Sequence, residues 1–329
     1  MAKILIIRLS SFGDVVLTTP VIRCLKNQYP GGVEIHFLVK RKFYDVIKAN
    51  PHISKFHILE KEFGEVIKEL KNENFDFIID LHNNIRSLFV KYMLWIKSYS
   101  LNKINIRKWL LVNLKINFLP ATHIVDRCFK TVEPLGIEND GLGLDYFIPR
   151  EDEIEISAFP HAFQNGFIVF AIGGNYNTKK LPVQKISSIC QKIKRPIILL
   201  GGKEDFENGE MIYAENKDHC FNMCGKLNIN QSASVIRQSK KVITHDTGMM
   251  HIAAAFKKEI ISVWGNTIPE FGMYPYFGDL FSGSKGKIFQ VQNLSCRPCS
   301  KLGFKSCPKG HFNCMNKHPE QDIAQEASF

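Results

Sequence analysis

Short, nearly continuous apolar runs constrain the fold of this chain more than any other feature. Lys3 to Leu9 reads KILIIRL, and Phe75 to Asp80 reads FDFIID. Strands that are buried on both faces of a parallel sheet carry such runs. Helical patterns alternate with them, which predicts a doubly wound α/β sheet. In the first half we predict strands over Lys3 to Leu9, Val33 to Leu38, Lys55 to Ile58 and Phe75 to Asp80, and helices over Asp14 to Gln28, Tyr44 to Lys48 and Phe63 to Lys71.

A second alternation of the same kind fills the rest of the chain. Residues Tyr146 to Asn165 contain prolines and several acids without a periodic pattern, which suits a linker. The 329 residues are enough for two domains, predicted over 1–155 and 156–329. Two Rossmann-like halves would place a ligand cleft between them, at the carboxyl ends of the strands. In the second half we predict strands over Phe167 to Ile172 and Pro196 to Leu200, and helices over Val183 to Ile193, Phe206 to Glu215 and Gln231 to Ser239.

The segment Lys241 to Asn266 predicts a strand, a polar turn, a short helix and a further strand. His245, Asp246, Thr247 and Gly248 occupy the turn, directly before a helix whose unpaired N–H groups and dipole favour a bound anion. Gly248 permits close approach of a phosphate, and Thr247 offers a hydroxyl. A cap formed by Asp246 and Thr247 is the alternative. The chain lacks G-x-G-x-x-G and G-x-x-x-x-G-K-[ST], so neither a standard dinucleotide fold nor a P-loop is indicated.

Composition indicates a globular protein with an anionic partner. The apolar content is 45%, and no apolar run approaches the roughly 18 residues that span a bilayer. The apolar run at the N-terminus is too short for a signal peptide, so we expect a cytoplasmic protein. The net charge of +11 would suit nucleic acid, acidic lipid or a phosphorylated small molecule. Because zinc-finger, RRM and KH signatures are missing, we expect no nucleic-acid partner.

The basic excess is concentrated between Leu81 and Phe118, where the chain has no Asp or Glu. Aromatic residues are interleaved with the bases, a mixture expected where helices meet anionic headgroups or a glycolipid. The alternative is an ordinary pair of amphipathic helices with aromatics in the core and solvated lysines. The residues concerned are Arg86, Lys91, Lys97, Lys103, Arg107, Lys108 and Lys115, with Phe89, Tyr92, Trp95, Tyr99, Trp109 and Phe118.

Nine cysteines without an export signal are expected to be thiols or metal ligands rather than disulfides. Four of them, Cys296, Cys299, Cys307 and Cys314, form C-x₂-C-x₇-C-x₆-C in the C-terminal tail. The C-x₂-C pair has a metal-ligand spacing, and four thiolates would complete a structural zinc site. The second pair has a less standard spacing, so free thiols packed in a loop are the alternative.

Three motifs together carry a resemblance to a known family. They are RLSSFGDVVLTTPVIRCLK near the N-terminus, DLHNNIRS at Asp80 to Ser87, and HDTGMMHIAAAF. The sequence resembles the heptosyltransferases of lipopolysaccharide core biosynthesis, glycosyltransferase family 9. Met249 stands where family members usually have Pro, and Lys179, Lys180, Leu181 and Pro182 stand where they commonly have Lys-Arg-Trp-Pro.

The resemblance implies a GT-B enzyme with an acceptor-binding N-terminal and a donor-binding C-terminal Rossmann-like domain. Such an enzyme transfers a heptose from ADP-heptose to the lipid A-linked inner core, with inversion and without a required metal. Its partners would be an ADP-sugar, a lipid-linked glycan and the cytoplasmic face of the inner membrane, where it would lie peripherally. Two alternatives stay open: a family 9 transferase that uses another nucleotide sugar, and a catalytically inactive GT-B-like binding protein.

The resemblance also implies roles for particular residues. Asp14 matches the catalytic aspartate, which would act as general base, and Lys179 matches a lysine that meets the donor phosphates. Glu204 or Asp205 suits a ribose-binding carboxylate by topology. The other expected donor-binding residues are Gly173, Gly174, Lys180, Asp246, Thr247, Gly248, Met249 and His251, where His251 could equally be a packed histidine. The expected acceptor-binding residues are Ser11, Gly13, Arg86 and Arg127, where the arginines could pair with phosphates or sugar-acid carboxylates.

Overall fold

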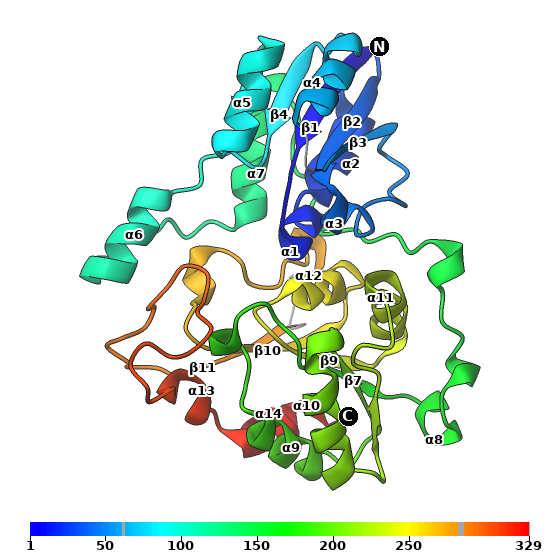
Figure 1. Cartoon of the computed structure of the whole chain (residues 1–329), viewed down its shortest axis with the longest axis vertical. Coiled ribbons are helices and arrows are strands. Elements are labelled where there is room, and N and C mark those ends of the chain that lie inside the picture. Colours follow the sequence, from blue (N-terminus) through cyan, green and yellow to red (C-terminus); the bar gives the residue numbers. More distant parts are fainter. Residues whose placement is uncertain (61–62, 282–285, 329) are drawn as a thin grey trace. The chain divides into compact units, whose positions relative to one another are not determined.

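Two parallel β-sheets form the frame of the computed structural model of this chain, which describes residues 1–60, 63–281 and 286–328 (Figure 1). Each sheet belongs to its own unit. The first unit comprises Met1–Lys103, Thr122–Phe147 and Tyr276–Phe281. The second comprises Ile104–Ala121, Ile148–Pro275 and the described residues from 286 onward. The chain therefore enters each unit more than once, whereas the prediction divided it once, between residues 155 and 156. Residues 61–62, 282–285 and 329 of the predicted domains lie outside the described part.

The sheet of the first unit has the order β3-β2-β1-β4-β5, with every neighbouring pair parallel. β2 and β3 extend the sheet on one side of β1, and β4 and β5 extend it on the other side. The strand order therefore reverses between β1 and β4. This doubly wound topology confirms the predicted fold class. The strands are β1 (Ala2–Ile7), β2 (Val33–Lys40), β3 (Lys55–Leu59), β4 (Phe77–Asp80) and β5 (Ser98–Ser100), and the prediction missed the short, polar β5.

Helices cover both faces of this sheet. On one face α4 and α5 pack over Leu5, Ile7 and Leu38 through Val66, Leu70 and Val90. On the other, α2 packs against α7 and contacts β2. The helices of the unit are α1 (Phe12–Val16), α2 (Thr19–Gln28), α3 (Arg41–Tyr44), α4 (Phe63–Asn72), α5 (Ile85–Leu94) and α7 (Ile124–Val132), with 3₁₀ turns η1 (Glu133–Leu135) and η7 (Asp279–Phe281).

The predicted single helix from Asp14 to Gln28 is wrong, because the structure divides it into α1 and α2. Pro20 has no N–H to donate to the carbonyl of Val16. The Thr19 hydroxyl donates to that carbonyl instead, at 2.8 Å, and Thr18 does the same for Val15 at 2.7 Å. The break ends α1 early, so a short helix directly follows the first strand.

The sheet of the second unit has the order β11-β10-β9-β6-β7-β8 and is parallel throughout. Its order reverses between β6 and β9. The predicted strands and the predicted alternation are confirmed, although β8 and β11 were not foreseen. The strands are β6 (Ile168–Ala171), β7 (Ile197–Leu200), β8 (Cys220–Asn222), β9 (Lys241–His245), β10 (Glu259–Trp264) and β11 (Gly286–Gln290).

The core of the second unit lies between this sheet and α9, α10 and α14, where Phe170, Ile212 and Ile323 are buried together. α11 and α12 pack against each other, and α12 contacts β9 and β10. The helices are α6 (Asn105–Leu114), α8 (His161–Gln164), α9 (Val183–Lys192), α10 (Phe206–Glu215), α11 (Ile229–Gln238), α12 (Gly248–Ala255), α13 (Asn313–Asn316) and α14 (Glu320–Ala327), with 3₁₀ turns η2 (Arg150–Asp152), η3 (Ile156–Ala158), η4 (Asn177–Lys179), η5 (Lys203–Asp205) and η6 (Pro269–Phe271).

Most of the predicted linker, Tyr146 to Asn165, is part of the second unit. Asp152 is buried and accepts hydrogen bonds from Asn228 at 2.6 Å and Asn230 at 3.0 Å. Phe159 and Phe163 are buried as well. The irregular sequence pattern therefore reflects short 3₁₀ turns that pack onto α11 rather than a solvated connection. In the described residues, every helix is too short or too polar to cross a bilayer.

Candidate functional site

The residues predicted to carry function collect at the carboxyl ends of the strands, where the strand order reverses. In the first unit these are the loops that follow β1 and β4. In the second they are the loops that follow β6 and β9. Parallel α/β sheets bind ligands at such positions, because the loops after the two central strands diverge to opposite faces and leave a crevice.

Asp14 lies in α1, immediately after β1, and both of its carboxylate oxygens are engaged. One oxygen forms an ion pair with Arg8 at 2.5 Å. The other accepts a hydrogen bond from the Ser11 hydroxyl at 2.6 Å and from the Ser11 backbone N–H at 3.1 Å. Its side chain retains 25% exposure, so a ligand can reach it. Asp14 therefore caps its own helix and is presented at the crevice at the same time.

Arg8 organises this loop, although the sequence analysis did not single it out. Its side chain is buried beside Asp14, and it also donates to the carbonyls of Ser10 and Leu81. The guanidinium thus ties the loop after β1 to the loop after β4. A signal was available, because Arg8 is the one charged residue after Lys3 in the run KILIIRL.

The loop after β4 brings His82 and Arg86 to the same edge. Asp80 shapes this turn by accepting from the backbone of His82 at 3.0 Å and of Asn83 at 2.7 Å. Burial, together with the charge of Arg8, lowers the pKa of His82 to about 4, so its ring is neutral at neutral pH. Arg86 is exposed in the first turn of α5. Sequence reasoning missed His82, despite its place inside the quoted DLHNNIRS motif.

Arg86 has a second basic residue beside it. Lys40 ends β2, and its pKa is lowered by burial and by the charge of Arg86. A bound anion would relieve the repulsion that the Arg86 charge exerts on Lys40. Lys40 was not predicted, because a lysine at the end of a strand is unremarkable in sequence.

The remaining predicted acceptor residues also lie in the first unit. Ser11 precedes α1, and Gly13 is buried within it. Arg127 is buried in α7, where burial lowers the pKa of its guanidinium. The charges of Arg8, Arg127 and Asp14 all act on the thiol of Cys128, whose pKa burial raises to about 12. Arg127 and Asp14 therefore both act electrostatically on this buried thiol.

In the second unit Lys179 forms an ion pair with Asp246. Lys179 ends η4, and its ammonium lies 2.5 Å from the Asp246 carboxylate and 3.3 Å from the Asp246 carbonyl. The Thr267 hydroxyl, from the loop after β10, donates to the same carboxylate oxygen at 2.8 Å. Asp246 thus positions the lysine rather than capping α12. Thr267 is a further residue that the sequence analysis did not identify.

Lys180 and Asp205 form a second ion pair, in which the aspartate is buried and the lysine partly exposed. The Lys180 ammonium lies 3.0 Å from Asp205, which also accepts from the backbone N–H of Gly202 at 3.0 Å. Asp205 is 1% exposed, whereas Glu204 is exposed. The structure thereby separates the two carboxylates that sequence could not distinguish: Asp205 holds the loop, and Glu204 faces solvent.

Gly173 and Gly174 bring the loop after β6 close to these residues. A Cβ at Gly173 would lie 2.6 Å from the Asp205 carboxylate, and one at Gly174 would lie 3.2 Å from the Thr247 methyl group. Only residues without side chains allow the loops after β6, β7 and β9 to converge in this way. Predicted residues of all three loops therefore lie close together in the second unit.

The N-terminus of α12 follows directly on the loop after β9. Thr247 is its N-cap residue with extended backbone, yet its side chain makes no capping hydrogen bond. Thr247, Gly248 and Met249 are partly exposed, and the first N–H groups of a helix have no intrahelical acceptor. His251 is buried within the helix. Its predicted donor role would need a ligand to reach a side chain that is 3% exposed.

His245, at the end of β9, holds the neighbouring loop. Its Nε2 accepts a hydrogen bond from the backbone N–H of Leu181 at 3.0 Å. Burial lowers the pKa of His245 to about 3, and the charge of Lys180 acts in the same direction. The neutral ring fixes the residues that follow Lys179 and Lys180.

The four cysteines of the C-terminal tail influence one another electrostatically. Burial raises the pKa of Cys314 to about 12, and the other three thiols add to this. The Cys296 sulfur lies 3.8 Å from Nε2 of His311. Within the described residues, however, no three of the four sulfurs lie within 4.8 Å of one another. A zinc ion would require these side chains to draw together, and the zinc site stays a prediction.

Comparison with known proteins places this chain in a family. The family model of glycosyltransferase family 9 (heptosyltransferase) matches residues 63–301. Lipooligosaccharide heptosyltransferase 2 of Haemophilus ducreyi is 25% identical over 299 residues, which are 82% of this chain and 85% of that protein.

Solved structures show the same fold. The glycosyl transferase family 9 structure from Veillonella parvula has a TM-score of 0.77 at 19% identity and covers 99% of this chain and 96% of that chain. Escherichia coli heptosyltransferase WaaC with ADP has a TM-score of 0.66 at 19% identity, with 99% and 100% covered. The GT-B fold predicted from the resemblance is thereby confirmed, and the family match extends over most of the chain. The protein is a glycosyltransferase and belongs to glycosyltransferase family 9 (heptosyltransferase).

Proposed function

We propose that this protein transfers a heptose from ADP-heptose to a lipid A-linked inner-core acceptor of lipopolysaccharide, with inversion at the anomeric carbon and Asp14 as general base. One observation carries the proposal: a partly exposed carboxylate, fixed by Arg8, stands at the reversal point of the first sheet in a family 9 chain. Asp14 precedes the matched residues 63–301, so its role rests on this geometry and on the motif around it.

Asp14 is arranged to receive a proton from an acceptor hydroxyl. Inversion by direct displacement needs a base within hydrogen-bond distance of the attacking oxygen. The Ser11 hydroxyl, 2.6 Å from Asp14, occupies one hydrogen-bonding position at the carboxylate. An acceptor hydroxyl would replace it there, while Arg8 holds the carboxylate in place.

The second unit supplies groups that suit a nucleotide diphosphate. The Lys179 ammonium, the Thr247 hydroxyl and the N–H groups at the start of α12 would stabilise the charge that grows on the leaving ADP. Asp246 would hold Lys179 in position, as it does in this structure. Glu204 would accept hydrogen bonds from the ribose hydroxyls, because Asp205 is occupied by Lys180.

Arg86 and Lys40 suit the anionic part of an inner-core acceptor. Both lie at the carboxyl edge of the first sheet, and their charges reinforce each other. A bidentate pair between Arg86 and a sugar-acid carboxylate or phosphate would give orientation as well as charge compensation. Arg127 is buried, so it would attract the anionic acceptor through its charge rather than contact it directly.

Helix α5 suits attachment to the membrane that carries such an acceptor. Its exposed apolar residues follow helical spacing, so they form one stripe instead of facing the core. The exposed fractions are 86% for Ile85, 59% for Leu88, 44% for Phe89, 68% for Tyr92 and 85% for Trp95. A stripe of this kind, flanked by bases, would place the protein peripherally at the cytoplasmic face of the inner membrane.

The donor and the acceptor are tested together in a transfer assay. The purified full chain is given ADP-heptose, UDP-sugars or GDP-sugars with a heptose-free lipid A-linked acceptor, and the product is followed by mass spectrometry. We expect heptose transfer from ADP-heptose alone. Efficient transfer from a UDP- or GDP-sugar would support a different donor. Binding of the nucleotide sugar without any transfer or hydrolysis would support an inactive binding protein.

A zinc ion in the cysteine tail would be structural, because none of its thiols lies in the loops of the proposed donor site. Metal analysis of protein purified without a histidine tag, with and without Cys296→Ser and Cys299→Ser, tests this. One zinc per chain that is lost in the double variant would support the proposal.

A further inference from the structure

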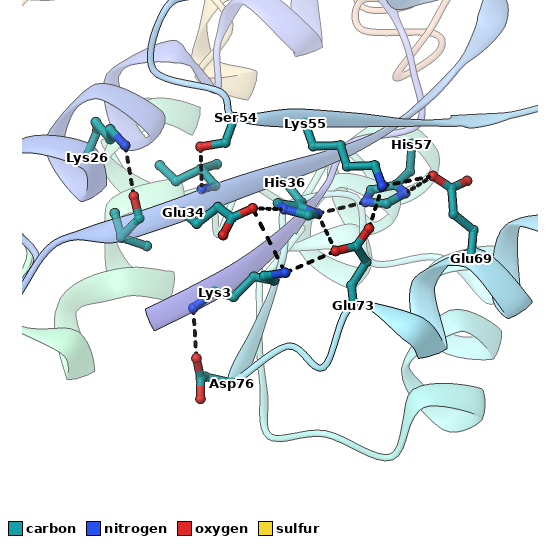
Figure 2. Close-up of polar contacts among 12 residues, drawn as sticks. Lys3, Lys26, Glu34, His36, Ser54, Lys55, His57, Glu69, Glu73 and Asp76 are labelled. Carbon is teal, nitrogen blue, oxygen red and sulfur yellow. Dashed lines mark hydrogen bonds and ion pairs between the residues drawn. The ribbon is translucent and has the colours of Figure 1, made fainter. Parts of the chain in front are cut away.

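A polar cluster around His36 and His57 interrupts the apolar face of the first sheet (Figure 2). His36 in β2 and His57 in β3 are fully buried on the face that Leu38 and Leu59 continue toward the carboxyl ends. Glu69 in α4 and Glu73 just after it approach from the covering layer. Two fully buried histidines are costly unless their polar atoms are paired. The cluster therefore calls for a specific explanation.

Two carboxylates define which ring nitrogens carry hydrogen. Nε2 of His36 lies 2.7 Å from Glu34, and Nδ1 of His57 lies 2.8 Å from Glu69 (Figure 2). An ionised carboxylate only accepts hydrogen bonds, so both of these nitrogens must be N–H donors. In the neutral rings the lone pairs are then on Nδ1 of His36 and Nε2 of His57. These two atoms face each other at 2.9 Å.

Two facing lone pairs repel unless a cation lies between them. Glu73 supplies a third donor atom, with its Oε2 at 3.8 Å from Nδ1 of His36. The donor atoms of His36, His57 and Glu73 all lie within 4.8 Å of one another, the one such group of three or more potential metal ligands in the described residues. Two imidazole nitrogens and one carboxylate form a ligand set that Zn²⁺ accepts, and Glu34 and Glu69 stand where carboxylates orient metal-bound histidines.

Two lysines hold the carboxylate of Glu73. Lys3 lies at 3.1 Å from one of its oxygens and Lys55 at 2.5 Å from the other, so both ammonium groups compensate its charge.

We propose that Nδ1 of His36, Nε2 of His57 and Glu73 bind a divalent transition-metal ion, with Zn²⁺ as the expected species and water as the fourth ligand. Tetrahedral Zn–N bonds of about 2.0–2.1 Å would separate the two nitrogens to roughly 3.3 Å, a small movement from their present distance. Oε2 of Glu73 would exchange Lys3 for the metal, and Oε1 would keep its bond from Lys55. The ion would link β2, β3 and the end of α4.

Such a site would stabilise the first unit without taking part in the transfer reaction. His36 pairs in register with Lys55 near the start of β3, whereas Asp14 follows the carboxyl end of β1. The metal site therefore does not rest on the proposed function. Loss of the metal should lower thermal stability and leave the Michaelis constants for both substrates unchanged.

The test measures zinc per chain in protein without a histidine tag, after removal of metal and dialysis against buffered micromolar zinc. Any zinc in the cysteine tail is common to all variants and cancels in the difference. Wild type should bind one zinc more than Glu73→Gln and than His57→Gln. Glu65→Gln, an exposed acid on the same helix, is the matched control and should bind as much as wild type. Glu69→Gln should weaken binding about 10- to 100-fold, because it removes the partner that orients His57.

Thermal unfolding with and without zinc gives a second readout. The melting temperature of wild type and Glu65→Gln should rise with zinc, and that of Glu73→Gln should not. If His57→Gln does not fold, Glu73→Gln and Glu69→Gln decide, because both side chains reach solvent. Equal zinc content and equal melting shifts in wild type and Glu73→Gln would overturn the proposal. The proposal would also be overturned if wild type bound no zinc at this site. In that case a proton shared by the two facing ring nitrogens would be the cation between them.

Discussion

At the residue scale, each proposed catalytic side chain is held in place by a charged neighbour that does not itself take part in the reaction. Arg8 fixes Asp14, and Asp246 fixes Lys179. A carboxylate or ammonium on a long, mobile side chain loses entropy when it binds substrate, and a fixed partner removes much of that cost in advance. The reactive groups of both units are therefore preorganised in the absence of ligand.

Asp14→Asn should lower kcat by at least about 100-fold. The amide has nearly the same shape as the carboxylate, but it cannot take the proton from the acceptor hydroxyl. Donor affinity should stay nearly unchanged, since the donor groups belong to the second unit. Steady-state kinetics and nucleotide-binding titrations give the two values. Ser11→Ala is the control, since it removes one hydrogen bond to Asp14 and leaves the base. Turnover of Asp14→Asn at the wild-type level would exclude this residue as the base.

Arg86→Ala should raise the KM for the acceptor by about 10-fold or more and leave the KM for the donor within about twofold. The reason is that a bidentate charge-assisted contact is lost only on the acceptor side. Arg150→Ala, at an exposed basic residue in η2 of the second unit, serves as control in the same assay. A change confined to the donor KM would contradict this placement of Arg86.

Glu204→Gln and Asp205→Asn should behave differently. Glu204→Gln should weaken binding of ADP by about 10-fold with little loss of stability, because an exposed carboxylate is removed from the ribose. Asp205→Asn should lower the melting temperature, because it leaves Lys180 buried without its partner. Calorimetric titration and thermal unfolding separate the two effects. Equal loss of stability in both variants would refute the division of roles.

Residue identities were more predictable than residue partners. Asp14, Lys179 and Asp246 could be proposed from motifs, because those motifs hold a fixed spacing in one loop. Thr267 joins Asp246 only because β9 and β10 are neighbouring strands, which the local sequence does not encode. The charge of Arg86 reaches Lys40 for a similar reason, since β2 and β4 flank β1.

At the element scale, fully buried strands were predictable and short polar ones were not. β1, β6 and β7 have continuous apolar sequences because helices cover both faces of their sheets. β5 has the sequence SYS and lies at a sheet edge, so no apolar pattern marks it. The pattern of α5 was ambiguous for the opposite reason: its aromatic residues have core-like spacing, but they face solvent.

The exposed stripe of α5 predicts binding to anionic membranes. Tyr92→Ser combined with Trp95→Ser should reduce binding to vesicles that contain anionic lipid by about 10-fold, because two large aromatic surfaces no longer enter the interface. Sedimentation of protein with vesicles measures this. Met211→Ser removes a residue of α10 that is 54% exposed and should have no effect. Undiminished vesicle binding of the double variant would show that α5 is not the contact.

At the scale of the whole molecule, two buried histidines make stability depend on pH. Burial lowers the pKa of His82 to about 4 and of His245 to about 3, from an ordinary value of 6.5. Below pH 6.5 the unfolded chain binds protons that the folded chain does not. The free energy of unfolding should therefore decrease as the pH falls from about 6.5 toward 4, by at most about 1.4 kcal/mol per pH unit for each ring.

Urea unfolding at pH 7.5, 6.0 and 5.0 measures this slope. His82→Gln should make the slope smaller, because its side chain does not titrate. His161→Gln, on an exposed side chain of α8, should leave the slope unchanged. A slope that is identical in wild type and His82→Gln would mean that His82 takes up its proton in the folded state as readily as in the unfolded state.

The segment Tyr276–Phe281 belongs to the first unit although it follows most of the second in sequence. Tyr276 stacks on His123 at 4.7 Å between ring centroids and accepts a hydrogen bond from Asn139 at 2.6 Å. A gene fragment that ends at residue 155 would lack this segment and would carry residues 104–121 away from their own unit. Division of the enzyme into independently expressed halves should therefore fail at this boundary. Recovery of a folded protein should need coexpressed fragments, or a circular permutant that keeps every connection between the two units.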